Sequence, residues 1–93
     1  MSVEKSRTRP RTTGRLESAF QAALIKRYEA DGWYVVRLLA TTVRGLPDLL
    51  LTCPRRGVRW VEVKAKGGRL SPIQVYRHEE LRGRGFEVEV VTD

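Results

Sequence analysis

The sequence predicts an α/β domain in which two helices flank a small mixed sheet, with elements in the order α-β-β-β-α-β. Three observations lead to this fold class. Apolar residues recur at helical spacing over residues 16–28, alternation with a period of two marks strands between residues 33 and 65, and a capping sequence at residues 71–74 opens a second helix. A chain of 93 residues has room for one core. Helices covering a mixed sheet is the architecture that this order favours.

The first helix is expected to follow a polar segment. Residues 1–13 are basic and have no apolar period, so we predict a flexible arm there and a single domain over residues 14–93. Thr13 or Gly14 is the expected helix cap, and the DG pair at residues 31–32 ends the helix. The apolar positions of this helix are Leu16, Phe20, Ala23, Leu24 and Tyr28.

Three strands are predicted next. Residues 33–40, WYVVRLLA, have the composition of a strand, and Trp33 and Leu39 would be exposed on one of its faces, where they could contribute to a dimer interface. Residues 48–52 and 58–65 are predicted to form a hairpin whose turn, PRRG, is centred between them.

The last two elements are a helix and a strand. Residues 71–85 begin with Ser71 as the cap, Pro72 at the first helical position and Gln74 as the partner in a capping box. Residues 86–92, FEVEVVT, are predicted as an alternating strand. Its inward side chains would be Phe86, Val88 and Val90.

The predicted hairpin carries the charged residues Asp48, Glu62 and Lys64 among residues otherwise suited to a core. Pairing Thr52 with Val58 across the turn places Asp48 opposite Glu62, and directly opposed residues have β-carbons about 4.5–5.5 Å apart. Two carboxylates at that range repel each other and need a compensating cation. Lys64 lies on the same strand face as Glu62. The opposite face of the hairpin carries Leu49, Leu51, Val61 and Val63.

Two converging carboxylates are typical of a Mg²⁺ or Mn²⁺ site. Such an ion would polarise a phosphodiester oxygen and lower the pKa of a bound water. Lys64 would then orient the water or stabilise negative charge at phosphorus. The alternative is an ordinary carboxylate–lysine pair on a solvated face, and the spacing by itself does not decide between the two interpretations.

The net charge of +7 indicates a polyanionic partner, with nucleic acid favoured over an anionic membrane surface. Residues 1–14 account for +3 of it, so the predicted domain is basic as well. Arginines outnumber lysines 14 to 4, which suits phosphate recognition but is also what a biased genomic base composition would produce. Cys53 is the only cysteine, which excludes an intrachain disulfide and suits a reducing compartment. We expect no membrane span and no secretory signal.

Two motifs resemble those of a known family. GLPD at residues 45–48, followed by VEVK at residues 61–64, resembles the P-D…(D/E)-x-K signature of the restriction-endonuclease-like nucleases. The longer pattern of GLPDLLL, WVEVK and RLSPIQ resembles the VRR-Nuc branch of that superfamily, from about Leu16 to Val91. The resemblance implies a restriction-endonuclease-like core and a small stand-alone nuclease.

The resemblance also implies which residues carry the chemistry. The implied catalytic residues are Asp48, Glu62, Lys64 and Gln74. The implied ligands of a Mg²⁺ or Mn²⁺ ion are Glu17, Asp48, Glu62 and the carbonyl of Val63. Basic residues near the expected mouth of the site could hold phosphate, although solvated charges would look the same in the sequence: Arg44, Lys66, Arg69 and Arg77.

Some of these residues have structural explanations too. Glu17 would lie in the first turn of its helix, where the helix dipole favours a carboxylate. Ser71 and Gln74 complete a capping box that needs no catalysis. His78 has no second histidine with which to share a metal, so it is predicted at the surface, and Trp60 is predicted to serve packing.

By this resemblance the chain is expected to be a metal-dependent endonuclease that hydrolyses DNA as a homodimer, with selectivity for Holliday junctions or other branched DNA. It would act in the cytoplasm of a bacterium or a phage-infected cell, without a small-molecule cofactor. The alternatives are a non-catalytic nucleic-acid-binding module and a subunit of a larger DNA-processing complex.

Overall fold

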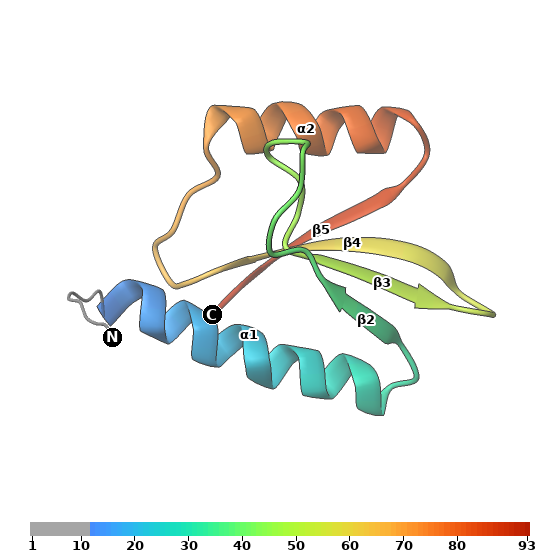
Figure 1. The fold of residues 1–93 in the computed structure, drawn as a ribbon, viewed down its shortest axis with the longest axis horizontal. Coiled ribbons are helices and arrows are strands. Elements are labelled where there is room, and N and C mark those ends of the chain that lie inside the picture. The colour runs from blue at the N-terminus through green and yellow to red at the C-terminus, as the bar shows by residue number, and fades with distance from the viewer. Residues whose placement is uncertain (1–11) are drawn as a thin grey trace.

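The computed structural model describes the backbone of residues 12–93 and the side chains of residues 17–93. Its elements follow the predicted order α-β-β-β-α-β (Figure 1). They are α1 (Thr12–Ala30), β2 (Tyr34–Arg37), β3 (Leu49–Cys53), β4 (Gly57–Lys64), α2 (Pro72–Gly83) and β5 (Glu87–Thr92). The predicted arm at residues 1–13 lies almost entirely outside the described residues. None of the described helices is long and apolar enough to cross a membrane.

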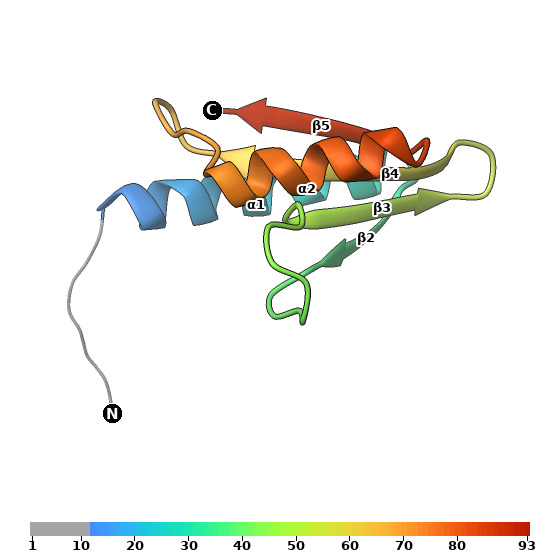
Figure 2. The ribbon, with the colours of Figure 1, turned by 90° about the horizontal axis from the view of Figure 1, so that it is seen from above.

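The four strands form one mixed sheet in the order β2-β3-β4-β5. The first two pairings are antiparallel, whereas β5 lies parallel to β4. A parallel neighbour requires a crossover connection, and α2 supplies it. The two helices lie on opposite sides of the sheet (Figure 1), and β5 and β2 form its two edges, as the view from above shows (Figure 2).

The apolar core lies between α1 and the sheet. Alternation along β3 and β4 directs one set of side chains to this face, where the residues are fully buried. The core consists of Leu24, Trp33, Leu49, Leu51, Val61 and Val63. Phe20, Ile25 and Tyr28 of α1 pack against it. The predicted helical stripe is thus confirmed at Phe20, Leu24 and Tyr28, but Ala23 is exposed and Ile25 lies outside the predicted stripe.

The first strand is shorter than predicted. Pairing with β3 stops at Arg37, although the N–H of Leu38 still donates to the carbonyl of Asp48 at 2.8 Å, and the chain then leaves the sheet as the loop 38–47. Trp33 is buried rather than exposed, because it is part of the apolar core, and the guanidinium groups of Arg56 and Arg59 also lie 4.4 and 5.1 Å from its ring centroid. The predicted contribution of Trp33 to an interface is therefore wrong.

The loop 38–47 comes close to the start of α2 at one position. Gly45 has a φ of +82°, and a β-carbon there would lie 2.5 Å from the carbonyl oxygen of Ile73. No other residue type fits both the left-handed backbone and this approach. The Nε of Arg77 donates to the Arg44 carbonyl at 2.8 Å and ties the loop to the helix.

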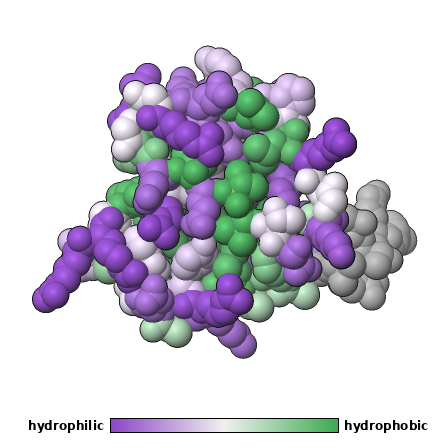
Figure 3. Space-filling model, turned by 180° about the vertical axis from the view of Figure 1, so that it is seen from behind, coloured by the Kyte–Doolittle hydropathy of each residue, from purple (hydrophilic) through white to green (hydrophobic). Residues whose placement is uncertain are grey.

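The last strand only partly confirms its predicted inward face. Val88 is half-buried, but Phe86 and Val90 keep exposed fractions of 41% and 39%. Phe86 packs edge-on against Trp60, with ring centroids 6.5 Å apart, which supports the packing role expected for Trp60. Figure 3 shows the molecule from behind, on the side of the sheet edge formed by β5. Apolar surface lies in the middle of this view.

Candidate metal and nuclease site

The predicted register of the hairpin is confirmed. Thr52 pairs with Val58 and Leu49 pairs with Val61 in the antiparallel ladder of β3 and β4. Asp48, directly before β3, continues this register beside Glu62. Period-two alternation then directs both carboxylates to the α2 face, away from the apolar core.

Asp48 is held by the backbone of two neighbouring segments. Its Oδ2 accepts a hydrogen bond of 2.8 Å from the N–H of Val63 on β4, and its own carbonyl accepts one from Leu38. Pro47, just before it, is fully buried. These contacts fix the half-buried Asp48 carboxylate directly before the start of β3, next to the β4 backbone.

Glu62 is a buried acid in the middle of the sheet, with an exposed fraction of 1%. Its two oxygens meet two side chains of α2. The Nε2 of His78 lies 3.1 Å from Oε1, and the Nε2 of Gln74 makes a long contact of 3.4 Å to Oε2. The carboxylate is thus held between the sheet and α2.

His78 is not at the surface, and the sequence-based prediction for it is wrong. Its exposed fraction is 1%, and its ring lies between α2 and Glu62. The spacing of Gln74, His78 and Leu81 at i, i+4 and i+7 contains the signal that was missed, because such residues share one helix face. Leu81 is buried on the same face.

Electrostatics distinguish Glu62 from an ordinary acid. Its pKa is raised from 4.5 to about 8, first by burial and then by the hydrogen bonding and negative charge of Asp48. Lys64 opposes the shift, and Glu17 adds to it. Burial, followed by the charges of Arg82 and Lys64, lowers the pKa of His78 and favours a neutral ring.

The donor set suits a hard divalent cation. Asp48 and Glu62 supply carboxylate oxygens from adjacent strands, as Mg²⁺ and Mn²⁺ prefer. A strand residue directs its N–H and C=O to the same neighbour, so the Val63 carbonyl lies on the side of Asp48. Among residues 17–93, no group of three or more acidic, histidine or cysteine side chains converges on a common point. Two carboxylates and a backbone carbonyl are therefore the set that fits a metal best.

Comparisons with known proteins identify the family of the chain. The VRR-NUC domain family matches residues 15–92. The chain belongs to the VRR-NUC domain family. A phage relative, "Putative nuclease p44" of Acyrthosiphon pisum secondary endosymbiont phage 1, is 28% identical over 75 residues, which are 81% of each chain. A solved VRR-NUC domain superposes with a TM-score of 0.74 at 37% identity, over 83% of this chain and 84% of the other.

In this VRR-NUC chain Gln74 forms the predicted capping box and also contacts the buried acid, while its catalytic role stays a prediction. Its Oε1 accepts from the N–H of Ser71 at 2.9 Å, and its own N–H donates to the Ser71 hydroxyl at 3.3 Å, so the predicted capping box is present. Its Nε2 remains free to reach Glu62. One amide side chain therefore links the start of α2 to the buried acid.

Glu17 and Lys64 of the VRR-NUC site lie at its margin. Because α1 begins at Thr12, Glu17 falls in the second turn rather than the first, which weakens the helix-dipole explanation. It is half-buried, and its charge acts on Glu62. Lys64 is half-buried at the end of β4 and is the cation that lowers the pKa of Glu62. Metal binding by Glu17 and catalysis by Lys64 stay predictions.

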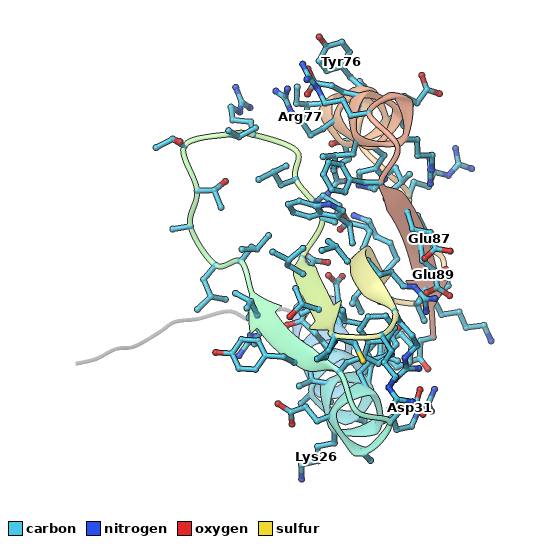
Figure 4. The ribbon with its side chains drawn as sticks, turned by 90° about the vertical axis from the view of Figure 1, so that its right-hand side faces the viewer. Lys26, Asp31, Tyr76, Arg77, Glu87 and Glu89 are labelled. Carbon is cyan, nitrogen blue, oxygen red and sulfur yellow. The ribbon has the colours of Figure 1, made fainter. Side chains whose placement is uncertain are left out.

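The predicted phosphate-binding residues differ in their surroundings. Arg44, Lys66 and Arg69 are exposed. Arg77 is engaged within the protein, because its Nη1 pairs with Glu80 at 2.8 Å while its Nε binds the Arg44 carbonyl. Figure 4 shows Arg77 on α2 beside the loop 38–47. These contacts explain Arg77 without nucleic acid, and its phosphate contact stays a prediction.

A cavity of about 360 Å³ lies between the loop 38–47 and the start of α2. Pro47 and Gln74 line this cavity. Pro47 directly precedes Asp48 in the sequence, and the side chain of Gln74 contacts Glu62. Arg44 and Thr41 add polar groups at the loop, whereas Leu39 adds an exposed apolar side chain.

Proposed function

We propose that this VRR-NUC protein is a divalent-metal-dependent endonuclease that hydrolyses phosphodiester bonds of DNA. The observation that carries the proposal is the pair of Asp48, directly before β3, and Glu62 of β4, which the hairpin register brings side by side on the α2 face. Like charges this close favour a shared cation over a structural role. Nucleases with PD-(D/E)XK-like domains generally use divalent metals, which agrees with this donor set.

The residues have separate roles in the proposed reaction. A bound Mg²⁺ or Mn²⁺ would supply Lewis acidity at the phosphoryl oxygen and lower the pKa of a water ligand. Asp48 and Glu62, with the Val63 carbonyl, would hold that ion. Lys64 would orient the water for in-line attack and stabilise charge developing on the phosphoryl group. By family analogy, cleavage leaves a 5′-phosphate and a 3′-hydroxyl.

The substrate and assembly form the finer part of the proposal. A net charge of +7 favours a nucleic-acid backbone, and the exposed Arg44, Lys66 and Arg69 would contact phosphates beside the carboxylates. Selectivity for branched DNA would follow if two copies of the chain presented their sites to two strands. Symmetric dimers are the commonest small assemblies, and the exposed Leu39 offers apolar surface for such a contact.

The proposal is tested by cleavage of an end-labelled four-way junction and a linear duplex of matched sequence. Purified protein is incubated with Mg²⁺, Mn²⁺ or EDTA, beside Asp48→Ala as a control that lacks one carboxylate. Metal-dependent products that disappear in the variant support the nuclease, and faster cutting of the junction supports branched-DNA selectivity. Retarded bands without product, equal for both proteins, would instead indicate a non-catalytic nucleic-acid-binding module.

A further inference from the structure

His78 makes a buried polar contact with Glu62 that the packing of α2 on the sheet does not require. Its ring is buried with an exposed fraction of 1%, and its Nε2 lies 3.1 Å from Oε1 of Glu62. Its other nitrogen, Nδ1, is buried and has no hydrogen-bond partner among the described side chains and backbone. The ring therefore has one polar contact with the protein, and that contact is to the site acid.

Packing by itself does not account for a histidine here. The next inward residue of α2 is Leu81, and an aliphatic side chain at position 78 would fill the same space beside the sheet. An unsatisfied buried polar atom costs about 1–3 kcal/mol, so the orphan Nδ1 makes the ring a poor choice for a purely apolar contact. The hydrogen bond to Glu62 is therefore what accounts for a polar ring at position 78.

The chemistry of the pair sets the direction of the hydrogen bond. An ionised carboxylate only accepts hydrogen bonds, so the Nε2 of His78 must carry the proton when Glu62 is ionised. Gln74 contacts the second oxygen from one turn earlier on α2, at 3.4 Å. Each carboxylate oxygen then has one donor on the helix side and keeps free lone pairs for another partner.

We propose that His78 is a positioning residue that holds the Glu62 carboxylate in the orientation in which it and Asp48 bind one divalent cation. The inference rests on the metal site of the proposed function. The Nε2–H of an imidazole suits this task because it holds one carboxylate oxygen and leaves the remaining lone pairs free for a cation. Loss of such an outer-shell partner typically lowers metal affinity by about 10–100-fold.

Two variants of similar size separate positioning from packing. His78→Gln keeps an amide donor that can reach Glu62, whereas His78→Leu fills the space without a donor. Mn²⁺ affinity is measured by titration calorimetry on the full chain without DNA, with Glu62→Gln as the variant that lacks the acid. We expect about 10–100-fold weaker binding for His78→Leu and affinity close to wild type for His78→Gln.

Each result bears on the inference. Wild-type affinity in a folded His78→Leu protein would overturn it, as would equal losses in folded Leu and Gln variants. Should His78→Leu not fold, as judged by circular dichroism, the Gln variant decides by itself: retained affinity supports positioning, and a tenfold loss contradicts it. A wild-type protein that binds no Mn²⁺ overturns both this inference and the proposed metal site, whereas binding that neither variant changes overturns the inference alone.

A second readout follows the proton directly. His78 is the only histidine in the sequence, so its ring nitrogen signals need no assignment by mutation. In ¹⁵N spectra of the Mg²⁺-loaded protein we expect the tautomer protonated at Nε2. A ring protonated at Nδ1 alone could not donate to Glu62 and would contradict the inference.

Discussion

Both faces of the sheet contain buried residues, but the chemistry of these residues is opposite. On the α1 face, Leu51 and Val61 are fully excluded from solvent within an aliphatic core. On the α2 face, Glu62 and His78 are as deeply buried at 1% exposure, yet they are ionisable and contact each other. Successive residues of β4 supply the two environments, because alternate side chains of a strand point to opposite faces.

This difference shows that burial has two uses in one small domain. The α1 face gains stability from removing apolar area from water. The α2 face encloses acids whose charge is unfavourable without a cation, which raises the pKa of Glu62 to about 8. Substitutions on the first face should therefore change unfolding, and those on the second should change metal binding and cleavage.

The largest expected effect is on catalysis. Asp48→Asn keeps an oxygen for the N–H of Val63 but removes the charge that would bind a metal. We expect cleavage of labelled DNA in Mg²⁺ to fall by about 10³-fold, with a melting temperature close to that of the wild type, because the oxygen that accepts from Val63 is kept. Retention of wild-type cleavage rates would place the metal elsewhere.

The next effect is on stability. Leu51→Ala removes fully buried methyl groups from the α1 face and should lower the free energy of unfolding by about 2–5 kcal/mol in urea titrations. Mn²⁺ affinity of the fraction that remains folded should not change. Tyr76→Ala, at a side chain that is 59% exposed, serves as the control and should alter stability by less than about 0.5 kcal/mol. Equal losses in both variants would contradict the assignment of the core.

A third effect depends on pH. The folded-state pKa of Glu62, about 8, lies above its ordinary value of 4.5, so the folded protein binds the proton more tightly than the unfolded chain. The resulting stabilisation is complete below pH 4.5 and is lost as the pH rises through about 8. In EDTA, the unfolding free energy of the wild type should fall by a few kcal/mol, relative to that of Glu62→Gln, as the pH is raised between these two values. If the unfolding free energies of the two proteins changed with pH in parallel, the pKa of Glu62 would not be raised in the folded protein.

The smallest effect separates the two roles of Gln74. Ser71→Ala removes the helix cap and should cost about 1 kcal/mol of stability while leaving the contact of Gln74 with Glu62 in place. Gln74→Ala removes a capping contact as well as the contact to the acid. We expect comparable losses in chemical denaturation but weaker Mn²⁺ binding for Gln74→Ala only. Weaker binding in both variants would mean that the cap itself positions the site.

Much of the site followed from local rules in the sequence. The turn fixed the register that places Asp48 beside Glu62, and period-two alternation put Lys64 on the face of Glu62 and away from Val61 and Val63. The capping box of Ser71 and Gln74 formed as its spacing predicts. These features depend on neighbours in sequence or across one hairpin, so the pattern of residue types was enough.

Other features depended on how the elements pack together. The burial of His78 is set by where α2 lies over the sheet, and that of Trp33 by its place in the core and by two arginines of the hairpin that lie over its ring. Phe86 and Val90 stay partly exposed, although their alternation is that of an inward face.

The sequence by itself therefore determined the order of the elements, the two-faced hairpin and the pair of carboxylates. Only the tertiary structure decided that the His78 ring is buried against Glu62. It also decided that β2 ends at Arg37, where the chain leaves the sheet toward α2. The physical reason is that alternation and capping act over a few residues, whereas the docking of a helix on a sheet depends on contacts between distant segments.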